Sequence, residues 1–129
     1  MSDGERATRV TRVGTVVVPV SDQDRSLEFY AGTLGFEVRL DAPFSDGIRW
    51  IEVAPPGSET TIALELRREG EPAGVEVSLA TQDADAAHAE LQERGAEADA
   101  AVMRMGDMVP PMFTFRDPDG NRFRMVERD

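Results

Sequence analysis

The feature of this sequence that most restricts its fold is an internal repeat. The segments VPVSDQDRSLEFYAGTLGFEV (residues 18–38) and LATQDADAAHAELQERGAEAD (residues 79–99) follow one plan. Each passes from the end of an apolar stretch through Asp-x-Asp into a helical pattern, and then through a glycine into a further stretch. The offset between the two is 61 residues, from 22 to 83 and from 24 to 85. A repeat of this length indicates two similar supersecondary units in one domain.

Each unit is predicted to contain a strand, a helix and three further strands. Val16, Val18 and Val20 share one face of the first stretch, with the period of two expected of a pleated strand. The helix that follows begins near Ser21 or Asp22, which are good N-cap residues, and ends at Gly35. The predicted strands are 11–20, 36–42, 48–53 and 61–67 in the first unit and 76–81, 96–105, 112–116 and 122–127 in the second, whose helix is 83–94. The predicted fold class is therefore α+β, with two βαβββ modules.

The chain has 129 residues, the size of one domain, 1–129. We expect module one at about 12–68, module two at about 74–128 and a flexible N-terminus at 1–11. There is no cysteine, so no disulfide forms. The N-terminus lacks the apolar core of a signal peptide, and no apolar run approaches the ~20 residues of a membrane span. We expect a cytoplasmic protein with no membrane partner.

The charge of the chain is strongly acidic. Its net charge is -11, from 25 acidic residues against 14 basic residues, and every basic residue is arginine. Such a surface repels DNA, RNA and anionic membranes, so no nucleic-acid partner is expected. Two explanations of the acidity stay open: it keeps the protein in solution, or it attracts a cationic ligand.

Two motifs give the chain a resemblance to a known superfamily. One is Asp-x-x-Arg-Ser-x-x-Phe-Tyr from Asp22, followed by Leu-Gly-Phe, and the other is Phe-x-Asp-Pro-Asp-Gly-Asn from Phe115. With the repeated βαβββ order they resemble the vicinal oxygen chelate superfamily, which includes glyoxalase I, extradiol dioxygenases, fosfomycin-modifying enzymes and the bleomycin resistance proteins. The resemblance covers residues 12–127. It implies a curved mixed sheet around a concave cleft, in a homodimer, and leaves the activity open because this fold hosts several chemistries.

In metal-dependent members of that superfamily, four side chains in the cleft hold a divalent ion, two from each module. The matching positions in this chain are Thr15, Glu65, Glu76 and Arg124. A catalytic divalent site needs about three His, Glu, Asp or Cys ligands, and this set has two, beside a guanidinium that repels the ion. The single histidine, His88, lies on the second helix, where we expect a partly buried structural residue. We therefore expect no metal and no other cofactor.

The polar set can serve another purpose. Arg124 can pair with Glu65 or with Glu76, because a guanidinium suits carboxylates. Such a pair is either purely structural, or it leaves one acid free to receive a ligand.

Other side chains are candidates for the lining of a pocket. Trp50, the sole tryptophan, shares a strand face with Glu52 and is either a stacking platform or aromatic core. The segment VMRMGDMVPPM (residues 102–112) contains Met103 and Met105, whose thioethers suit a pocket wall or packing under a loop. The predicted ligand-binding residues are Thr15, Trp50, Glu52, Arg124, Met103 and Met105.

Three functions fit these residues. The first is metal-independent binding of a small organic molecule, which the acidic surface allows to be cationic. The second is a lyase, isomerase or dioxygenase in which Glu65 or Glu76 is the general base and Arg124 steadies an oxyanion. The third is an interaction module without pocket chemistry. The incomplete ligand set favours the first.

The two acidic residues in the segment Asp117–Asn121 suggest a calcium-binding loop. The segment lacks the residue spacing and the final glutamate of an EF-hand, however. Pro118 and Gly120 are instead typical of a turn between two strands. We predict a hairpin turn there.

Overall fold

The computed structural model describes residues 7–71 and 74–128, and the rest of the predicted flexible N-terminus, residues 1–6, lies outside that range. Module one contains β1 (Thr15–Val20), α1 (Gln23–Leu27), a π-helical continuation (Glu28–Thr33), β2 (Glu37–Ser45), β3 (Ile48–Ala54) and β4 (Thr61–Leu66). Module two contains β5 (Glu76–Thr81), α2 (Ala84–Glu93), β6 (Glu97–Ala98), β7 (Met112–Arg116) and β8 (Arg122–Glu127). Both modules have the predicted βαβββ order.

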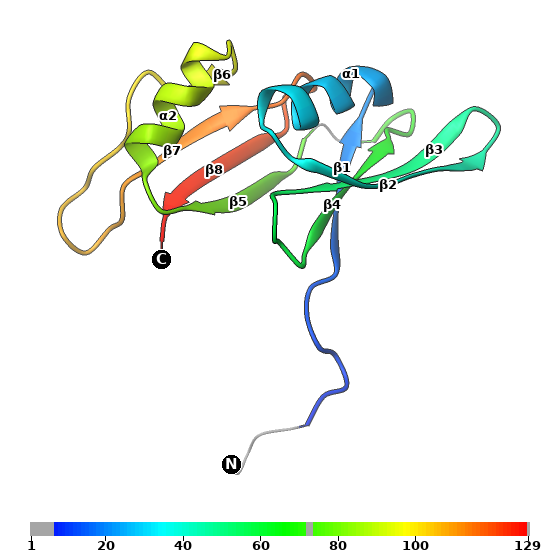
Figure 1. Cartoon of the computed structure of the whole chain (residues 1–129), viewed down its shortest axis with the longest axis horizontal. Coiled ribbons are helices and arrows are strands. Elements are labelled where there is room, and N and C mark those ends of the chain that lie inside the picture. Colours follow the sequence, from blue (N-terminus) through cyan, green and yellow to red (C-terminus); the bar gives the residue numbers. More distant parts are fainter. Residues whose placement is uncertain (1–6, 72–73, 129) are drawn as a thin grey trace.

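The strands form two separate mixed sheets of four strands, ordered β1-β4-β3-β2 and β5-β8-β7-β6. The first strand of each module pairs in parallel with the last, and the remaining pairs are antiparallel. Each βαβββ module thus forms its own mixed sheet, with β1 and β5 as edge strands, and the predicted fold class is confirmed. Both helices lie on the same side of the sheets, the upper side in Figure 1. Within the described residues, the opposite side of each sheet carries no helix.

The helices begin and end at the predicted signals. Asp22 and Asp83 are the N-caps, and each side chain accepts a hydrogen bond from the backbone N–H three residues later. Gly35 and Gly95 follow the helices at φ 78° and 82°, a conformation that glycine adopts without strain. The π-helical turn Glu28–Thr33 was not predicted. None of the helices in residues 7–71 and 74–128 is long and apolar enough to cross a membrane.

The first strand is shorter than predicted. It begins at Thr15 instead of residue 11, because its partner β4 begins at Thr61. The Thr61 N–H still donates to the Gly14 carbonyl, 3.0 Å away, but no strand lies beside residues 7–13 within the described chain.

The predicted strand 96–105 is also mostly absent. β6 ends at Ala98, and a single bridge from Met103 to Met112 is all that follows in this range. The reason lies at Asp99, whose carboxylate accepts a hydrogen bond from the Thr114 N–H at 2.9 Å. A side chain thus replaces the backbone carbonyl of a continuing strand, and the chain turns away into a loop.

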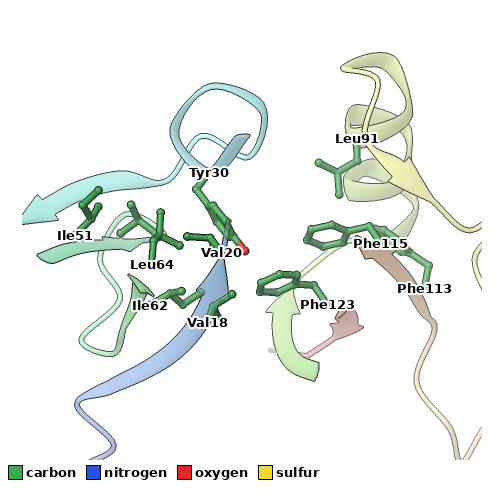
Figure 2. Close-up of a cluster of buried hydrophobic side chains, with 11 residues drawn as sticks. Val18, Val20, Tyr30, Ile51, Ile62, Leu64, Leu91, Phe113, Phe115 and Phe123 are labelled. Atoms are coloured by element: carbon green, nitrogen blue, oxygen red, sulfur yellow. The ribbon is translucent and has the colours of Figure 1, made fainter. Parts of the chain in front are cut away.

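One hydrophobic core crosses from module one to module two (Figure 2). Phe123 of β8 lies between the modules and contacts Tyr30 at 5.8 Å and Phe115 at 5.3 Å between ring centroids. The fully or nearly fully buried members are Val18, Val20, Tyr30, Ile51, Val53, Ile62, Leu64, Leu91, Phe113, Phe115 and Phe123. Burial of this shared surface holds the two modules together.

The predicted turn after Asp117 is confirmed, and it also clamps the modules together. Asp117, 4% exposed, accepts hydrogen bonds from two backbone N–H groups of its own turn (both 2.9 Å) and from the Tyr30 hydroxyl (2.7 Å). Asn121 donates to Asp117 and to the Pro19 carbonyl of module one, at 2.8 Å each. Gly120 takes φ 86°. Burial, and then the charge of Asp117, raise the pKa of Tyr30 well above its usual range.

Candidate functional site

The side of each sheet that faces away from the helices carries the polar residues singled out from the sequence. Along β3 and β4, buried Ile51 and Leu64 point to the core, so their neighbours Trp50 and Glu65 point to the opposite side. We call this side of the β1-β4-β3-β2 sheet the open face of module one. The structure places Thr15, Trp50, Glu52 and Glu65 on that face, and places Glu76 and Arg124 on the corresponding face of module two.

A line of hydrogen bonds crosses three strands of this open face. The Trp50 indole N–H donates to Glu52 Oε2 at 2.7 Å, and the Thr61 hydroxyl donates to Glu52 Oε1 at 2.8 Å. The Thr61 hydroxyl also lies 2.9 Å from that of Thr15. Both oxygens of Glu52 are thus bound by neutral groups, and no cation of the described chain forms an ion pair with it. Thr61 was missed from the sequence, although its place on the face of Glu65 was a usable signal.

Trp50 and Glu65 line a cavity of about 310 Å³. The ring of Phe44, 70% exposed, lies 6.2 Å from Trp50 at an angle of 48°, so two aromatic side chains form one wall. The lining residues are Phe44, Ile48, Arg49, Trp50, Glu65, Leu66, Arg67 and Arg68. The volume lies at the lower end of the range for small-molecule sites, and aromatic walls beside a few charged groups are typical of them. Phe44 was not predicted, because it stands in a loop-like PFSDG segment that the structure extends as strand β2.

In module two the carboxylate of Glu76 is paired with arginine side chains. Arg124 lies 3.1 Å from Glu76, and Arg122 lies 3.5 Å from the other oxygen of the same carboxylate. Of the two partners that the sequence left open for Arg124, the structure therefore selects Glu76. All three side chains are about half exposed, so solvent screens the pairing and its net contribution to stability is small. Arg122 was missed as the second cation.

These positions do not fit a divalent metal ion. Glu65 and Thr15 lie on one sheet, and Glu76 lies on the other with two guanidinium groups against its oxygens. A metal at Glu76 would have to displace both arginines and would meet their positive charge. Within residues 7–71 and 74–128, no three His, Cys, Asp or Glu side chains are grouped so that they could hold an ion.

His88 has a structural role, as predicted. Its Nε2 lies 2.7 Å from the Asp99 carbonyl oxygen, and its ring meets Phe113 edge-on at 5.0 Å. His88 belongs to α2, and its half-buried side chain packs against the segment that follows β6.

The methionine segment lies on module two, and neither Met103 nor Met105 is among the residues that line the Trp50 cavity. The loop is tied to α2 by Arg104, which binds Asp85 at 2.6 and 3.2 Å. Met105 and Met108 are 55% and 94% exposed. In a single chain these thioethers therefore form no wall of the cavity in module one.

Comparison with known proteins gives a consistent family. The profile of the Glyoxalase/Bleomycin resistance protein/Dioxygenase superfamily matches residues 12–125. A protein of the same superfamily from Sphaerobacter thermophilus DSM 20745 has a crystal structure with a TM-score of 0.84 and 36% identity, covering 94% of this chain and 100% of the other. TnmS3, described as an antibiotic binding protein from Streptomyces sp. CB03234, gives a TM-score of 0.81 and 35% identity over 93% of this chain and 98% of the other. The uncharacterized protein YetH of Bacillus subtilis (strain 168) is 28% identical over 92% of this chain and 99% of its own length.

Proposed function

Because the chain belongs to the glyoxalase/bleomycin resistance protein/dioxygenase superfamily, we propose that it binds a small organic molecule at the open face of module one without a metal ion. The observation that carries this proposal is the cavity that Trp50 and Glu65 both line. The similarity to an antibiotic-binding protein over nearly the whole chain supports the same class of function.

The chemistry of the cavity indicates the kind of ligand. Trp50 offers an aromatic face, and its orientation is fixed because its N–H is bound to Glu52. Glu65 has no ion-pair partner among the described residues, so it can accept a hydrogen bond or a positive charge. Arg67 and Arg68 also line the cavity and suit an acceptor group elsewhere on the ligand. We therefore propose a flat, ring-containing ligand with a cationic or hydrogen-bond-donating group.

A homodimer is part of the proposal. A second opening, of about 870 Å³, lies between the modules and is lined mainly by apolar and small residues, among them Val16, Ile62, Val77 and Leu79. These side chains continue the hydrophobic core outward, and a second copy of the chain would cover them. Sedimentation velocity tests this, and a monomer at micromolar concentration would contradict it. The cytoplasmic location expected from the sequence is likewise proposed, and cell fractionation tests it.

The binding test uses the single tryptophan. Proflavine, a planar aromatic cation, should quench Trp50 fluorescence to saturation, and calorimetry should give one site per chain. Trp50→Ala should weaken binding by about tenfold or more, because stacking on an aromatic face contributes roughly 1–2 kcal/mol. Phe36→Leu, which alters an aromatic residue on the core side, is the matched control. Equal affinity of Trp50→Ala and the unaltered chain would refute the site.

The same protein preparation tests the absence of a metal. Purified without chelator, it should carry no stoichiometric Zn, Ni, Mn or Fe by elemental analysis. A stoichiometric metal would contradict the proposal and would favour an enzyme that uses Glu65 or Glu76 as general base.

A further inference from the structure

In the sheet of module one, the backbone pairing between β3 and β4 is interrupted beside the cavity. β3 and β4 pair at two positions, Glu52 with Ala63 and Val53 with Ile62. If this register continued along both strands, Trp50 would lie directly opposite Glu65. The backbone pairing stops before that position. The two cavity-lining residues therefore lie beyond the last backbone pair of the two strands.

The side-chain amide of Gln23 bridges β3 and β4 where their backbone pairing is interrupted. Gln23 is 6% exposed and lies at the first turn of α1, on the core side of the sheet. Its Nε2 donates to the Arg49 carbonyl at 2.7 Å and to the Leu64 carbonyl at 2.9 Å, and its Oε1 accepts from the Arg49 N–H at 3.1 Å. One amide thus binds both strands at the positions next to Trp50 and Glu65. It satisfies backbone groups that continued strand pairing would otherwise satisfy.

Module two provides an internal comparison. Its strands β7 and β8 correspond to β3 and β4, and they pair without interruption at five positions, from Met112 with Val126 to Arg116 with Arg122. At the repeat offset of 61 the counterpart of Gln23 is Ala84, which is fully buried and has no amide. The module with the amide has the interrupted ladder of backbone pairs, and the module without it has the continuous ladder.

We infer that Gln23 is a positioning residue that holds β3 and β4 apart, and that the gap admits a planar ring of the ligand between Trp50 and Glu65. Residues directly opposite on paired strands have Cβ atoms about 5 Å apart, which leaves no room for a ring between their side chains. With the strands separated, the two side chains border a cavity instead. The part of this inference that concerns a ligand rests on the proposed function, whereas the part that concerns strand separation does not.

The test replaces Gln23 by alanine, which reproduces the situation of Ala84. In Gln23→Ala, NMR should show new cross-strand contacts between the Trp50 and Glu65 backbones, because the freed groups of Arg49 and Leu64 pair with the facing strand. Proflavine affinity should fall by about tenfold or more as the cavity closes. Gln92→Ala, an exposed glutamine on α2, is the matched control and should change neither readout. Gln23→Met, which keeps the side-chain length without the hydrogen bonds, serves if the alanine variant does not fold.

The outcomes separate the two ideas. If β3 and β4 keep two paired positions in the folded Gln23 variant, the positioning role is wrong, whatever happens to binding. If the strands close but proflavine binds as before, the gap is not where the ring enters. If the unaltered protein binds no proflavine, the proposed ligand class fails, and strand pairing in the variants still decides the role of Gln23.

Discussion

Removing the hydroxyl of Tyr30 tests how the two modules are held together. Tyr30→Phe keeps the ring and its contacts with Phe123, and deletes the hydrogen bond to Asp117. The carboxylate keeps its bonds from its own turn and from Asn121. A buried hydrogen bond to a charged group contributes about 1.5–3 kcal/mol, so the free energy of unfolding at neutral pH should fall by about 2 kcal/mol. For a domain of this size the melting temperature should fall by roughly 5–10 °C.

The effect of the substitution should depend on pH. Burial, with the charge of Asp117 and its hydrogen bond, raises the pKa of Tyr30 in the folded protein, so the phenol stays protonated there after the unfolded chain has lost its proton. This stabilisation is complete below about pH 10, the pKa of an unfolded tyrosine, and is lost as the pH rises above it. The slope is about 1.4 kcal/mol per pH unit. Tyr30→Phe lacks this titration, so its stability should approach that of the unaltered protein in strong alkali.

Urea unfolding followed by circular dichroism at a series of pH values measures both effects. Tyr30 is the only tyrosine, so the ultraviolet absorbance of tyrosinate reports its ionisation directly. Tyrosinate should appear together with unfolding and not before it. Ser45→Ala, which removes an exposed hydroxyl, should leave stability unchanged. The reasoning is refuted if the two proteins lose stability in parallel above pH 10, or if the folded protein forms tyrosinate with an ordinary pKa.

Two further substitutions test smaller features. Thr61 is 8% exposed, and Thr61→Val removes the hydroxyl that donates to Glu52. Chemical unfolding should show a loss of stability of about 1.5 kcal/mol. No loss would mean that the line of hydrogen bonds on the open face is not formed. Arg104→Ala breaks an ion pair whose side chains are 54% and 63% exposed, so solvent screens it and urea unfolding should show no measurable change in stability. A clear loss of stability would contradict this view of the pair.

Local signals in the sequence are enough for most of the fold. Alternation along residues 76–81, the N-caps Asp22 and Asp83, and Gly35 after the first helix depend on neighbouring residues, and each element lies where these predicted it. The missing part of strand 96–105 depends instead on Asp99 reaching a strand 15 residues away. A pattern of residue types carries no sign of such a contact.

The candidate site is less predictable for the same reason. The sequence placed Trp50 and Glu52 on one face of their strand and Glu65 at a cleft position of the next, because a period of two decides facing. The sequence did not decide whether Arg124 pairs with Glu65 or with Glu76. The choice of Glu76 follows only from the pairing of β5 with β8, which a single sequence does not show. The Gln23 contacts join residues 26 and 41 positions apart, so no local pattern reveals them.

The repeat places different side chains at corresponding positions of the two modules. The β4 position of Glu65 corresponds to Arg124 on β8, and the β1 position of Thr15 corresponds to Glu76 on β5. In module two the acid and the arginine neutralise each other across adjacent strands, and the ladder beside them is closed. In module one Glu65 forms no ion pair within the described residues, although Arg67 and Arg68 line the same cavity, and the backbone pairing of β3 with β4 stops before Glu65. The shared backbone plan preserves the core, while the differences at the positions of Gln23 and Glu65 give the two modules different cavities.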